Sequence, residues 1–337
     1  MSARAAAGAA ALAVLACTHA PAAPLATVSD GRPAMGTLLE LTLVGRDEVR
    51  LRALAAELFA EAERLDALLT TWDPASGTSR LNAAAGRGPQ PVAPELGRLL
   101  ERSQELSRET RGAFDVTVGP LVALWREAAA RGEWPPAAAL AAARSRVGSD
   151  RLRVAGGRAA LLTGSSLNLG GVAKGWALDR MLPRLRGAGV DAALLSFGQS
   201  SIWALGAPPD ASAGWRLLAR APGGNFLGVL ALRDRALSVS GSMGEAFEIA
   251  GRRVGHVLDP RSGLPLEVDR EALVAAPDAT LAEALSKALL VLGPEQGLPL
   301  VAAQPGCEAL LADADGRSWR TPGWDASLAW EPAEAER

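Results

Sequence analysis

The stretch WRLLARAPGGNFLGVLALRDRALSVS, residues 215–240, decides the fold class. Its apolar residues stand in short runs, and Pro, Gly, Asn and Asp separate one run from the next. This spacing is typical of strands joined by tight turns, which pair antiparallel, because a parallel crossover needs a far longer connection. The pattern continues to Val257, so we expect antiparallel pairing throughout this part of the chain.

Helices and further strands flank this stretch in separate runs. Apolar residues recur at helical spacing in residues 47–69, 93–109 and 281–292, and Pro135 and Pro136 open an Ala-rich helix. The other expected strands are residues 37–45, two short strands within 151–162, and 191–198. This arrangement predicts an α+β domain with antiparallel or mixed sheets and flanking helices, and not a doubly wound parallel sheet.

The two ends of the chain differ from its body. Residues 1–17 predict a signal peptide, because Arg4 precedes an apolar run and small residues precede Cys17. The order Ala-Val-Leu-Ala-Cys also fits a lipoprotein cleavage site, so Cys17 is expected to carry lipid, with plain secretion as the alternative. The expected divisions are a tether at 18–33, one folded domain at 34–330 and a solvated tail at 331–337.

The expected location is therefore the periplasm, with the membrane reached only through the lipid. No later stretch of the chain reaches the roughly 20 apolar residues that a membrane-spanning helix needs. The formal net charge is −2, from 35 basic and 37 acidic residues, so no bulk field attracts nucleic acid or an anionic membrane.

Two residue types are rare enough to direct attention to single positions. Lysine occurs only at Lys174 and Lys287, and every other basic residue in the charge count is Arg. Histidine occurs only at His19 and His256. An ammonium is a compact point charge and not a planar fork, so its retention at two positions raises the question of a local purpose.

His256 precedes the turn DPRSG, residues 259–263, and follows an expected strand. A single His is more often an ordinary surface or core residue than a catalyst. The folded body has no second His and no H-E-x-x-H motif, so zinc-dependent hydrolysis and Cys-His catalysis are set aside. His256 is then the natural proton acceptor near neutral pH.

The stretch SLNLGGVAKGWALD, residues 166–179, predicts a strand, a glycine turn and a helix. Backbone N–H groups at such a turn and the following helix N-terminus favour a bound anion. The glycine spacing fits neither the P-loop nor the dinucleotide-binding motif. A Gly-Gly turn alone is often only a packing device, but Lys174 beside it favours a phosphate.

Glu283 and Lys287 stand four residues apart on the last predicted helix, and Thr280 precedes Glu283 by three. This spacing has an ordinary structural interpretation, since Thr280 and Glu283 fit a capping box and Glu283 and Lys287 have the preferred orientation of a helical ion pair. A functional interpretation of the same residues needs support from elsewhere.

Taken together, these segments resemble the bacterial FAD:protein FMN transferases, the ApbE-type flavin transferases. The matching stretches, in chain order, are MGT at 35–37, TTWDPASGTSRLN at 70–82, GAFDVTVGPLVALW at 112–125, NLGGVAKGWALD at 168–179, SFG at 196–198, GWRLLARAP at 214–222, SVSGS at 238–242, GHVLDPRSG at 255–263 and TLAEALSKALLVLG at 280–293. The resemblance implies an enzyme that moves FMN from FAD to a Thr hydroxyl of an acceptor protein and releases AMP.

The resemblance also implies roles for single residues. Met35 and Trp72, the latter where the family usually has Tyr, are expected to sandwich the isoalloxazine ring, and His256 is expected to take the proton of the acceptor Thr. The residues implied to contact the rest of FAD are Gly36, Thr37, Asp115, Gly170, Gly171, Lys174, Asp179 and Asp259. The acceptor in this family is commonly a membrane redox subunit with a D-G-x-x-x-A-T-like stretch.

The chain departs from the family where Mg²⁺ is expected. By resemblance, a main-chain oxygen at Ala173 would bind the metal together with an Asp and a Thr on the last helix, but Glu283 and Lys287 stand there. An ammonium has no oxygen to offer and repels a dication. One hypothesis is that Lys287 neutralises the diphosphate in place of Mg²⁺. The other is that Lys287 turns to solvent, and Mg²⁺ binds through Glu283, Ala173, phosphate oxygens and water.

Three alternatives to flavin transfer stay open from the sequence. The first is a lipoprotein of the same fold that binds FAD without transferring FMN. The second is a hydrolase that uses water in place of Thr and forms FMN and AMP. The third is a structural or interaction lipoprotein whose matching segments serve only the fold.

Overall fold

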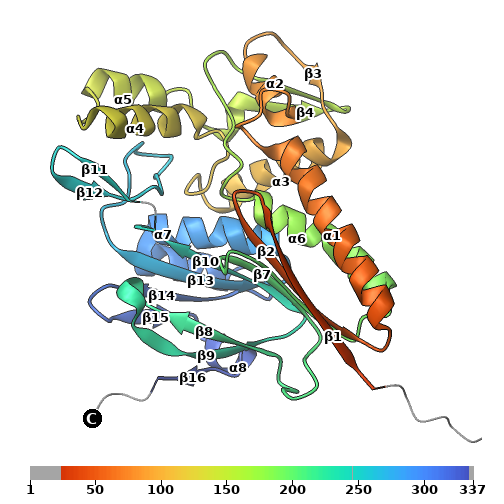
Figure 1. Ribbon diagram of the computed structural model, residues 1–337. Helices are drawn as coiled ribbons and strands as arrows, with labels where there is room; N and C mark the ends of the chain where they lie inside the picture. Colours follow the sequence, from red (N-terminus) through yellow and green to blue (C-terminus); the bar gives the residue numbers. More distant parts are fainter. Residues whose placement is uncertain (1–23, 245, 334–337) are drawn as a thin grey trace, which may run out of the picture.

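The computed structural model describes residues 24–244 and 246–333, so the predicted signal peptide, Cys17 and His19 lie outside the described residues. An eight-stranded sheet forms the centre of the fold, with the strand order β1-β2-β6-β7-β10-β13-β14-β15 (Figure 1). Every neighbouring pair in it is antiparallel, which confirms the expected sheet type. The strands are β1 (Ala26–Ala34), β2 (Thr37–Gly45), β6 (Ala192–Phe197), β7 (Ser201–Leu205), β10 (Arg235–Gly241), β13 (Arg270–Ala276), β14 (Glu308–Asp313) and β15 (Ser318–Arg320).

Three smaller sheets complete the β-structure. Residues 215–232 form β8 (Trp215–Arg220) and β9 (Phe226–Leu232), an antiparallel pair that β16 (Glu331–Pro332) extends. The others are the pair β11 (Phe247–Ile249) and β12 (Arg252–Val254), and the sheet of β3 (Gln90–Pro91), β4 (Leu152–Ala155) and β5 (Arg158–Leu161). The α+β expectation is therefore confirmed.

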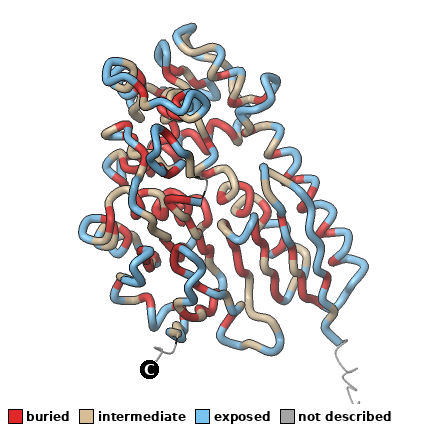
Figure 2. Tube along the Cα trace, turned by 60° about the vertical axis from the view of Figure 1, so that its left-hand side comes forward, coloured by how far each residue is buried: buried red, intermediate tan, exposed pale blue. Residues whose placement is uncertain are grey.

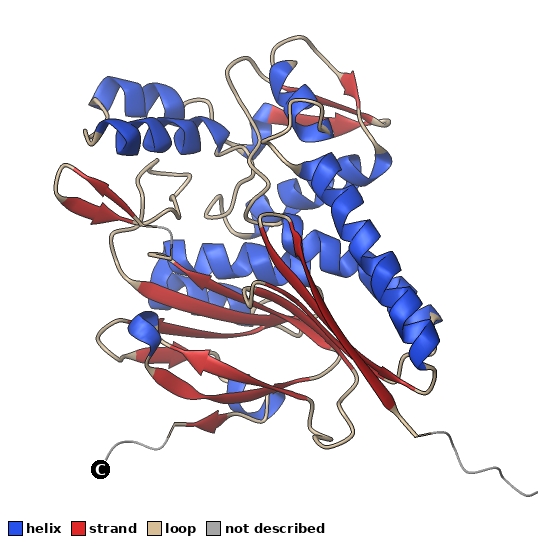
Figure 3. Cartoon of the chain, viewed as in Figure 1, coloured by secondary structure: helices blue, strands red, loops and turns tan. Residues whose placement is uncertain are grey.

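Helices α1, α6 and α7 cover one face of the central sheet, and the β8–β9 sheet with α8 covers the other (Figures 1 and 3). The helices are α1 (Glu48–Leu69), α2 (Gly77–Ala83), α3 (Pro94–Glu109), α4 (Gly119–Arg131), α5 (Ala137–Arg144), α6 (Ala173–Gly187), α7 (Ala279–Ala302) and α8 (Trp324–Ser327); 3₁₀ turns occupy Ser149–Arg151 and Pro222–Gly224. None of the helices in the described ranges is long and apolar enough to cross a membrane.

Strand alternation explains the two layers. In β10, Ala236 belongs to the core beneath the helices, whereas its neighbour Leu237 belongs to the core beneath the β8–β9 sheet. Successive side chains of a strand point to opposite faces, so one strand serves both cores. Figure 2 shows the buried residues gathered along the central sheet and the helices against it. The first half of helix α7, residues 279–290, is buried nearly all round, which fits its central position.

The structure corrects the expected tether and tail. Residues 26–33 are not a tether, because they form most of β1, which pairs with β2 from Ala26 to Ala34. β1 is an edge strand with mostly exposed side chains, so it lacks the apolar alternation that reveals a strand in a sequence. The tail was also placed too early, because Glu331–Pro332 pairs with β9.

Two local expectations also need correction. Residues 166–169 form no strand; Ser166 makes only an isolated bridge to Val118. The last helix extends beyond the expected 281–292, because the chain kinks at Gly293, which has a φ of 72°, and helical structure continues to Ala302. The glycine accepts a backbone angle that other residues rarely adopt, so the helix bends there and does not stop.

Candidate active site

The matched segments meet at one end of the central strands, which we call the site end. Because neighbouring strands alternate in direction, the site end collects the start of β2, the turn between β6 and β7, the end of β10 and the start of β13. Most segments that carried the sequence resemblance therefore become neighbours although they are far apart in the chain (Figure 1).

The turn Met35-Gly36 joins β1 to β2 at the site end. Both residues have positive φ, 51° and 75°, as in the tight two-residue hairpin turn that matches strand twist. The Met35 N–H donates to Asp66 Oδ2 of α1 at 3.0 Å, which fixes the turn against that helix. Thr37 follows at the base of the turn and packs against Gly198, where an added Cβ would lie 2.3 Å from Thr37 Oγ1. Met35, Gly36 and Thr37 thus form one wall beside the SFG turn.

The glycine turn Gly170-Gly171 opens α6 at the same place. Asn168 Oδ1 accepts a hydrogen bond from the Gly170 N–H at 3.0 Å, and the Ala173 N–H donates to Leu169 O at 2.9 Å. A Cβ at Gly171 would lie 3.6 Å from Phe114 and 4.0 Å from Lys287 Cε, so glycine leaves room between two side chains. The helix N-terminus and its partial positive charge therefore lie next to Lys287.

Lys174 continues this positive region from the first turn of α6. Its Nζ donates to Ser200 Oγ at 2.8 Å, and the Ser200 hydroxyl in turn donates to Phe197 O at 3.1 Å. Sequence analysis did not identify Ser200 as a site residue. Its signal was the hydroxyl pair that follows the SFG turn, since side-chain hydroxyls after a glycine turn commonly anchor neighbouring groups.

Glu283 and Lys287 lie on α7 below the site end. Glu283 is fully buried, with Oε1 accepting from the Ser201 hydroxyl; Oε2 has no hydrogen-bond partner among the described residues. The Lys287 side chain is partly accessible, so its ammonium is held inside without being sealed off. Burial lowers the pKa of Lys287, the negative charge of Glu283 opposes that shift, and the positive charge of Lys174 adds to it. The positive charges of Lys174 and Lys287 therefore repel each other.

Asp179 joins α6 to α7 through hydrogen bonds to Ala279 and Thr280. Oδ1 accepts from the Ala279 N–H at 2.8 Å, and Oδ2 accepts from the Thr280 N–H at 2.9 Å and from Thr280 Oγ1 at 2.5 Å. At Gly175 a Cβ would lie only 2.4 Å from Ala279 O, so the helices touch backbone to backbone. The structure thus gives Asp179 a clamping role; direct contact with FAD stays a prediction.

The expected capping box at the start of α7 is wrong. The N-cap is Asp278, whose side chain accepts from the Leu281 N–H at 2.7 Å. Because the helix begins two residues earlier than expected, Thr280 lies inside its first turn and bonds Asp179. Glu283 is correspondingly free to bond Ser201 below the site. Glu283 is buried, and among the described residues its charge acts on Lys287 without a salt bridge within 4.0 Å.

His256 lies in the loop that follows β12, which we call the His256 loop (residues 255–263). The imidazole is exposed, and an added Cβ at Gly244 would lie 3.8 Å from its Cε1. Gly244 belongs to the turn that leaves β10, and Ser240 Oγ at the end of β10 lies 2.9 Å from Ser286 Oγ, next to Lys287. One strand end therefore connects the histidine to the helix that carries the lysine.

Asp259 holds the His256 loop closed. Its Oδ1 accepts from the Arg261 N–H and from Arg261 Nε, both at 2.9 Å, and Oδ2 accepts from Arg261 Nη2 at 3.0 Å. This bidentate contact between the Arg261 guanidinium and the Asp259 carboxylate stabilises the conformation of the loop. As with Asp179, the carboxylate is used inside the protein, and its contact with FAD stays a prediction.

Trp72 and Asp115 differ sharply in exposure. Trp72 is 77% exposed, with the Arg126 guanidinium 4.7 Å from its ring centroid, so one large aromatic face is presented on the surface. Asp115 is buried, and both of its oxygens are occupied: Oδ2 accepts from Ser107 Oγ, and Oδ1 accepts from the Thr117 N–H and hydroxyl. Trp72 is thus open on the surface, and its stacking on the flavin stays a prediction, whereas Asp115 shapes the turn before α4.

The metal expected by resemblance does not fit the donors present. No group of three or more His, Cys, Asp or Glu that could hold a metal ion occurs in residues 24–244 and 246–333. Glu283 offers one unbonded oxygen, and the nearby charged side chains Lys174 and Lys287 are cations. A dication would meet repulsion from two ammonium groups and attraction from one carboxylate.

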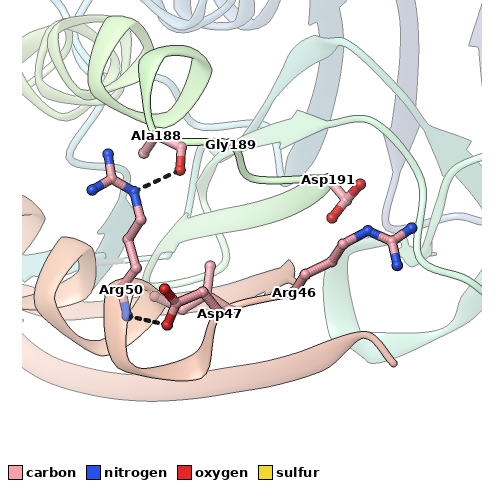
Figure 4. Close-up of a pocket in the computed structure, with 7 residues that line it drawn as sticks. Arg46, Asp47, Arg50, Ala188, Gly189 and Asp191 are labelled. Atoms are coloured by element: carbon pink, nitrogen blue, oxygen red, sulfur yellow. Dashed lines mark hydrogen bonds between the residues drawn. The ribbon is translucent and has the colours of Figure 1, made fainter. Parts of the chain in front are cut away.

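A surface hollow lies at the end of the central strands opposite to the site end. Its lining includes Arg46 and Asp47, which follow β2, and Asp191, which precedes β6 (Figure 4). Arg50 closes one side by donating from Nε to Ala188 O at 3.0 Å. This hollow lies away from the glycine turn and the lysines, so we do not assign the chemistry to it.

Comparisons with known proteins agree with this geometry. The model of the ApbE family matches residues 35–311. An FAD:protein FMN transferase of Klebsiella pneumoniae is 32% identical over 327 residues, covering 93% of each chain, and one of Salmonella typhimurium is 30% identical over 332 residues with the same coverage. The apo structure of the Pseudomonas stutzeri flavinyl transferase ApbE superposes with a TM-score of 0.78 and 30% identity, covering 90% of this chain and 97% of that one. The chain belongs to the ApbE family.

Proposed function

We propose that this protein is an FAD:protein FMN transferase, which moves FMN from FAD to a Thr hydroxyl of an acceptor protein and releases AMP. The observation that carries the proposal is the meeting of a glycine turn at a helix N-terminus, two ammonium groups and the body's one histidine at the site end of a chain of this family. A diphosphate needs the first two groups, and an attacking hydroxyl needs the third.

His256 supplies the general base. As the Thr oxygen forms its bond to the FMN-side phosphorus, the imidazole accepts the hydroxyl proton. The bond between that phosphorus and the bridging oxygen breaks, and AMP leaves with the bridging oxygen. Exposure suits this role, because an acceptor protein must bring its Thr to the ring from outside. An imidazole is a suitable general base for chemistry at neutral pH.

The positive region holds the diphosphate through the reaction. Phosphoryl transfer depends mainly on positioning and on neutralising charge. Lys174, oriented by Ser200, and the N-terminus of α6 supply fixed positive charge beside the glycine turn. The Asp179 clamp holds α6 against α7, so the two lysines keep their spacing as charge moves to the leaving group. No step is assigned to Mg²⁺, because the donors do not fit it.

Met35 and Trp72 would hold the flavin ring. Trp72 offers an exposed indole face, and Met35 is fixed at the tip of a tight hairpin turn by its N–H bond to Asp66. A thioether and an indole are polarizable and pack well on a flat heteroaromatic ring. Gly36 and Thr37 would shape the wall below the ring.

Intact-mass measurement with FAD and a Thr-bearing acceptor peptide domain tests the proposal. The wild type is expected to add one FMN to the acceptor, an acceptor with Thr replaced by Ala is expected to gain nothing, and His256→Ala is expected to bind FAD but to transfer little. Release of FMN and AMP without an adduct would instead identify a hydrolase. A yellow protein that forms no product would identify a flavin-binding protein.

We also propose that the protein is exported to the periplasm and anchored through lipid on Cys17, where a membrane redox subunit would serve as acceptor. The support is the N-terminal sequence, with its positive residue, apolar run and small residues before the cysteine. Cys17→Ala should move the protein from the membrane fraction to the periplasmic fraction. An unchanged membrane association would contradict lipid anchoring.

A further inference from the structure

The α7 pair below the glycine turn is unusual for a diphosphate site. Glu283 is fully buried with one oxygen bonded to the Ser201 hydroxyl and the other without a described partner. A buried carboxylate of this kind is unfavourable unless a cation lies close by. Lys287, one helical turn later, is its nearest source of positive charge on α7, and the two charges interact. Glu283 thus places a negative charge near Lys287.

That cation points toward the glycine turn. Lys287 Cε lies 4.0 Å from the position that a Cβ of Gly171 would take, so the ammonium lies where α6 begins. Lys174, on the first turn of α6, is close enough to lower the pKa of Lys287 by repulsion. Two ammonium groups and a helix N-terminus face one carboxylate, which leaves excess positive charge at the turn.

The Lys287 side chain is held inside and not turned to solvent. Burial is the main influence on its ionisation, yet the residue keeps partial accessibility. Among the described residues, no hydrogen bond or ion pair within 4.0 Å engages its ammonium. An ammonium that has lost much of its water without gaining a hydrogen-bond acceptor is prepared for an anionic ligand.

We propose that the Lys287 ammonium is a built-in counter-ion that contacts the diphosphate of FAD in place of a divalent metal, so that this protein binds FAD without Mg²⁺. The inference rests on the proposed function for the identity of the ligand. A diphosphate carries about two negative charges, which the lysine pair and the helix N-terminus neutralise together. Glu283 supplies a nearby negative charge that partly offsets the burial of Lys287.

FAD affinity, measured by flavin fluorescence or calorimetry in EDTA and in excess Mg²⁺, tests the inference without relying on activity. The wild type is expected to change its Kd by less than about threefold between the two conditions, whereas Lys287→Met is expected to weaken FAD binding in EDTA about tenfold or more. Arg216→Met is the matched control, because Arg216 lies on β8 in an exposed ion pair with Glu331. The Kd of this variant for FAD should equal the wild-type value.

A double variant sharpens the test. Glu283→Asp with Lys287→Thr places an Asp and a Thr four residues apart, which are oxygen ligands that suit Mg²⁺. This variant is expected to gain about tenfold or more in FAD affinity from Mg²⁺. The wild-type comparison needs no variant, so poor folding of any mutant leaves the inference testable.

The outcomes separate this inference from the proposed function. If Mg²⁺ tightens FAD binding to the wild type tenfold or more, or if Lys287→Met leaves Kd in EDTA unchanged, the lysine does not replace the metal. If the wild type binds FAD equally in EDTA and loses it with Lys287→Met, but forms no FMN adduct on any acceptor, the inference stands and the transferase proposal fails. Absence of FAD binding in every condition overturns both.

Discussion

The joint between α6 and α7 and the His256 loop both serve the site, but they are built in opposite ways. At the joint, backbone meets backbone at Gly175, and Asp179 accepts three hydrogen bonds in a buried setting. In the loop, the histidine is exposed, and order comes from a short-range pair between Asp259 and Arg261. The lysine charges are thus positioned by rigid helix packing, whereas the proposed base, His256, lies on an accessible loop. Changes in the joint should alter stability, and changes at the open residues should alter chemistry.

The largest expected effect comes from Gly175→Ala. The new Cβ would lie 2.4 Å from Ala279 O, a backbone atom that cannot rotate away, so α6 and α7 must separate. We expect the free energy of unfolding to fall by about 3 kcal/mol, as overpacking of a tight core commonly does. Urea unfolding measures this change.

Gly187→Ala is the matched control, because it also lies in α6 and an added Cβ would have no neighbour within 4 Å. It should leave stability unchanged or raise it by up to about 1 kcal/mol through helix propensity. Equal stabilities of the two variants would show that the helices do not meet as closely as described.

The next effect is on catalysis at the open loop. His256→Ala should reduce the rate of FMN transfer about 100-fold or more through loss of the general base. Because the ring is exposed, the free energy of unfolding should change by less than about 0.5 kcal/mol. The rate comes from intact-mass time courses and the stability from urea unfolding.

Arg253→Ala, an exposed change on β12 beside the loop, serves as the control and should keep the wild-type rate. Equal loss of rate in both variants would point to loop disturbance and not to a base at His256.

A smaller effect, on the pH dependence of stability, concerns Asp179 at the joint between α6 and α7. Burial raises the pKa of Asp179 from 3.8 to about 7, with the Asp278 charge adding to the rise and the hydrogen bonds from Thr280 and Ala279 opposing it. Between these two values the folded protein retains a proton that the unfolded chain has released. Stability from this group is therefore complete at low pH and declines as pH rises through the window.

Asp179→Asn cannot titrate, so the decline of stability between about pH 4 and pH 7 should be smaller in the variant than in the wild type. Denaturant midpoints measured at several pH values for both proteins give this difference. Parallel curves would mean that Asp179 ionises in the folded protein as it does in the unfolded chain.

The same contrast explains what the sequence could predict. Residues 215–240 show their strands because each run buries one face, whereas β1 has a mostly exposed surface and was mistaken for a tether. Gly170, Gly171 and Lys174 could be expected to meet at a helix start because turn chemistry is local. The functions of Asp115, Asp179 and Asp259 could not be read in this way, since an Asp in a motif has the same letter whether it contacts a ligand or a backbone N–H.

Position along a helix was a further limit. The spacing of Thr280 and Glu283 fits a capping box, but Asp278 is the N-cap, and this shift of two residues changes the partners of both Thr280 and Glu283. Partners from distant segments, such as Asp179 and Ser201, are set by how α6, β7 and α7 pack. That information is not local to the motif.

The smallest expected effect concerns Trp72, the most open of the predicted site residues with a ring. Since the indole is 77% exposed and packs against the Arg126 guanidinium, Trp72→Ala should change the free energy of unfolding by less than about 0.5 kcal/mol. Loss of stacking on the flavin should weaken FAD binding by about 1 kcal/mol, or roughly fivefold in Kd. Trp72→Phe keeps a ring face and should recover most of that affinity. If Trp72→Ala destabilised the fold as much as loss of a core aromatic residue, the indole would be part of the packed fold. If both variants bound FAD like the wild type, the indole would not contact the flavin. Either result would mean that the contrast between the rigid joint and the open residues does not extend to the flavin ring.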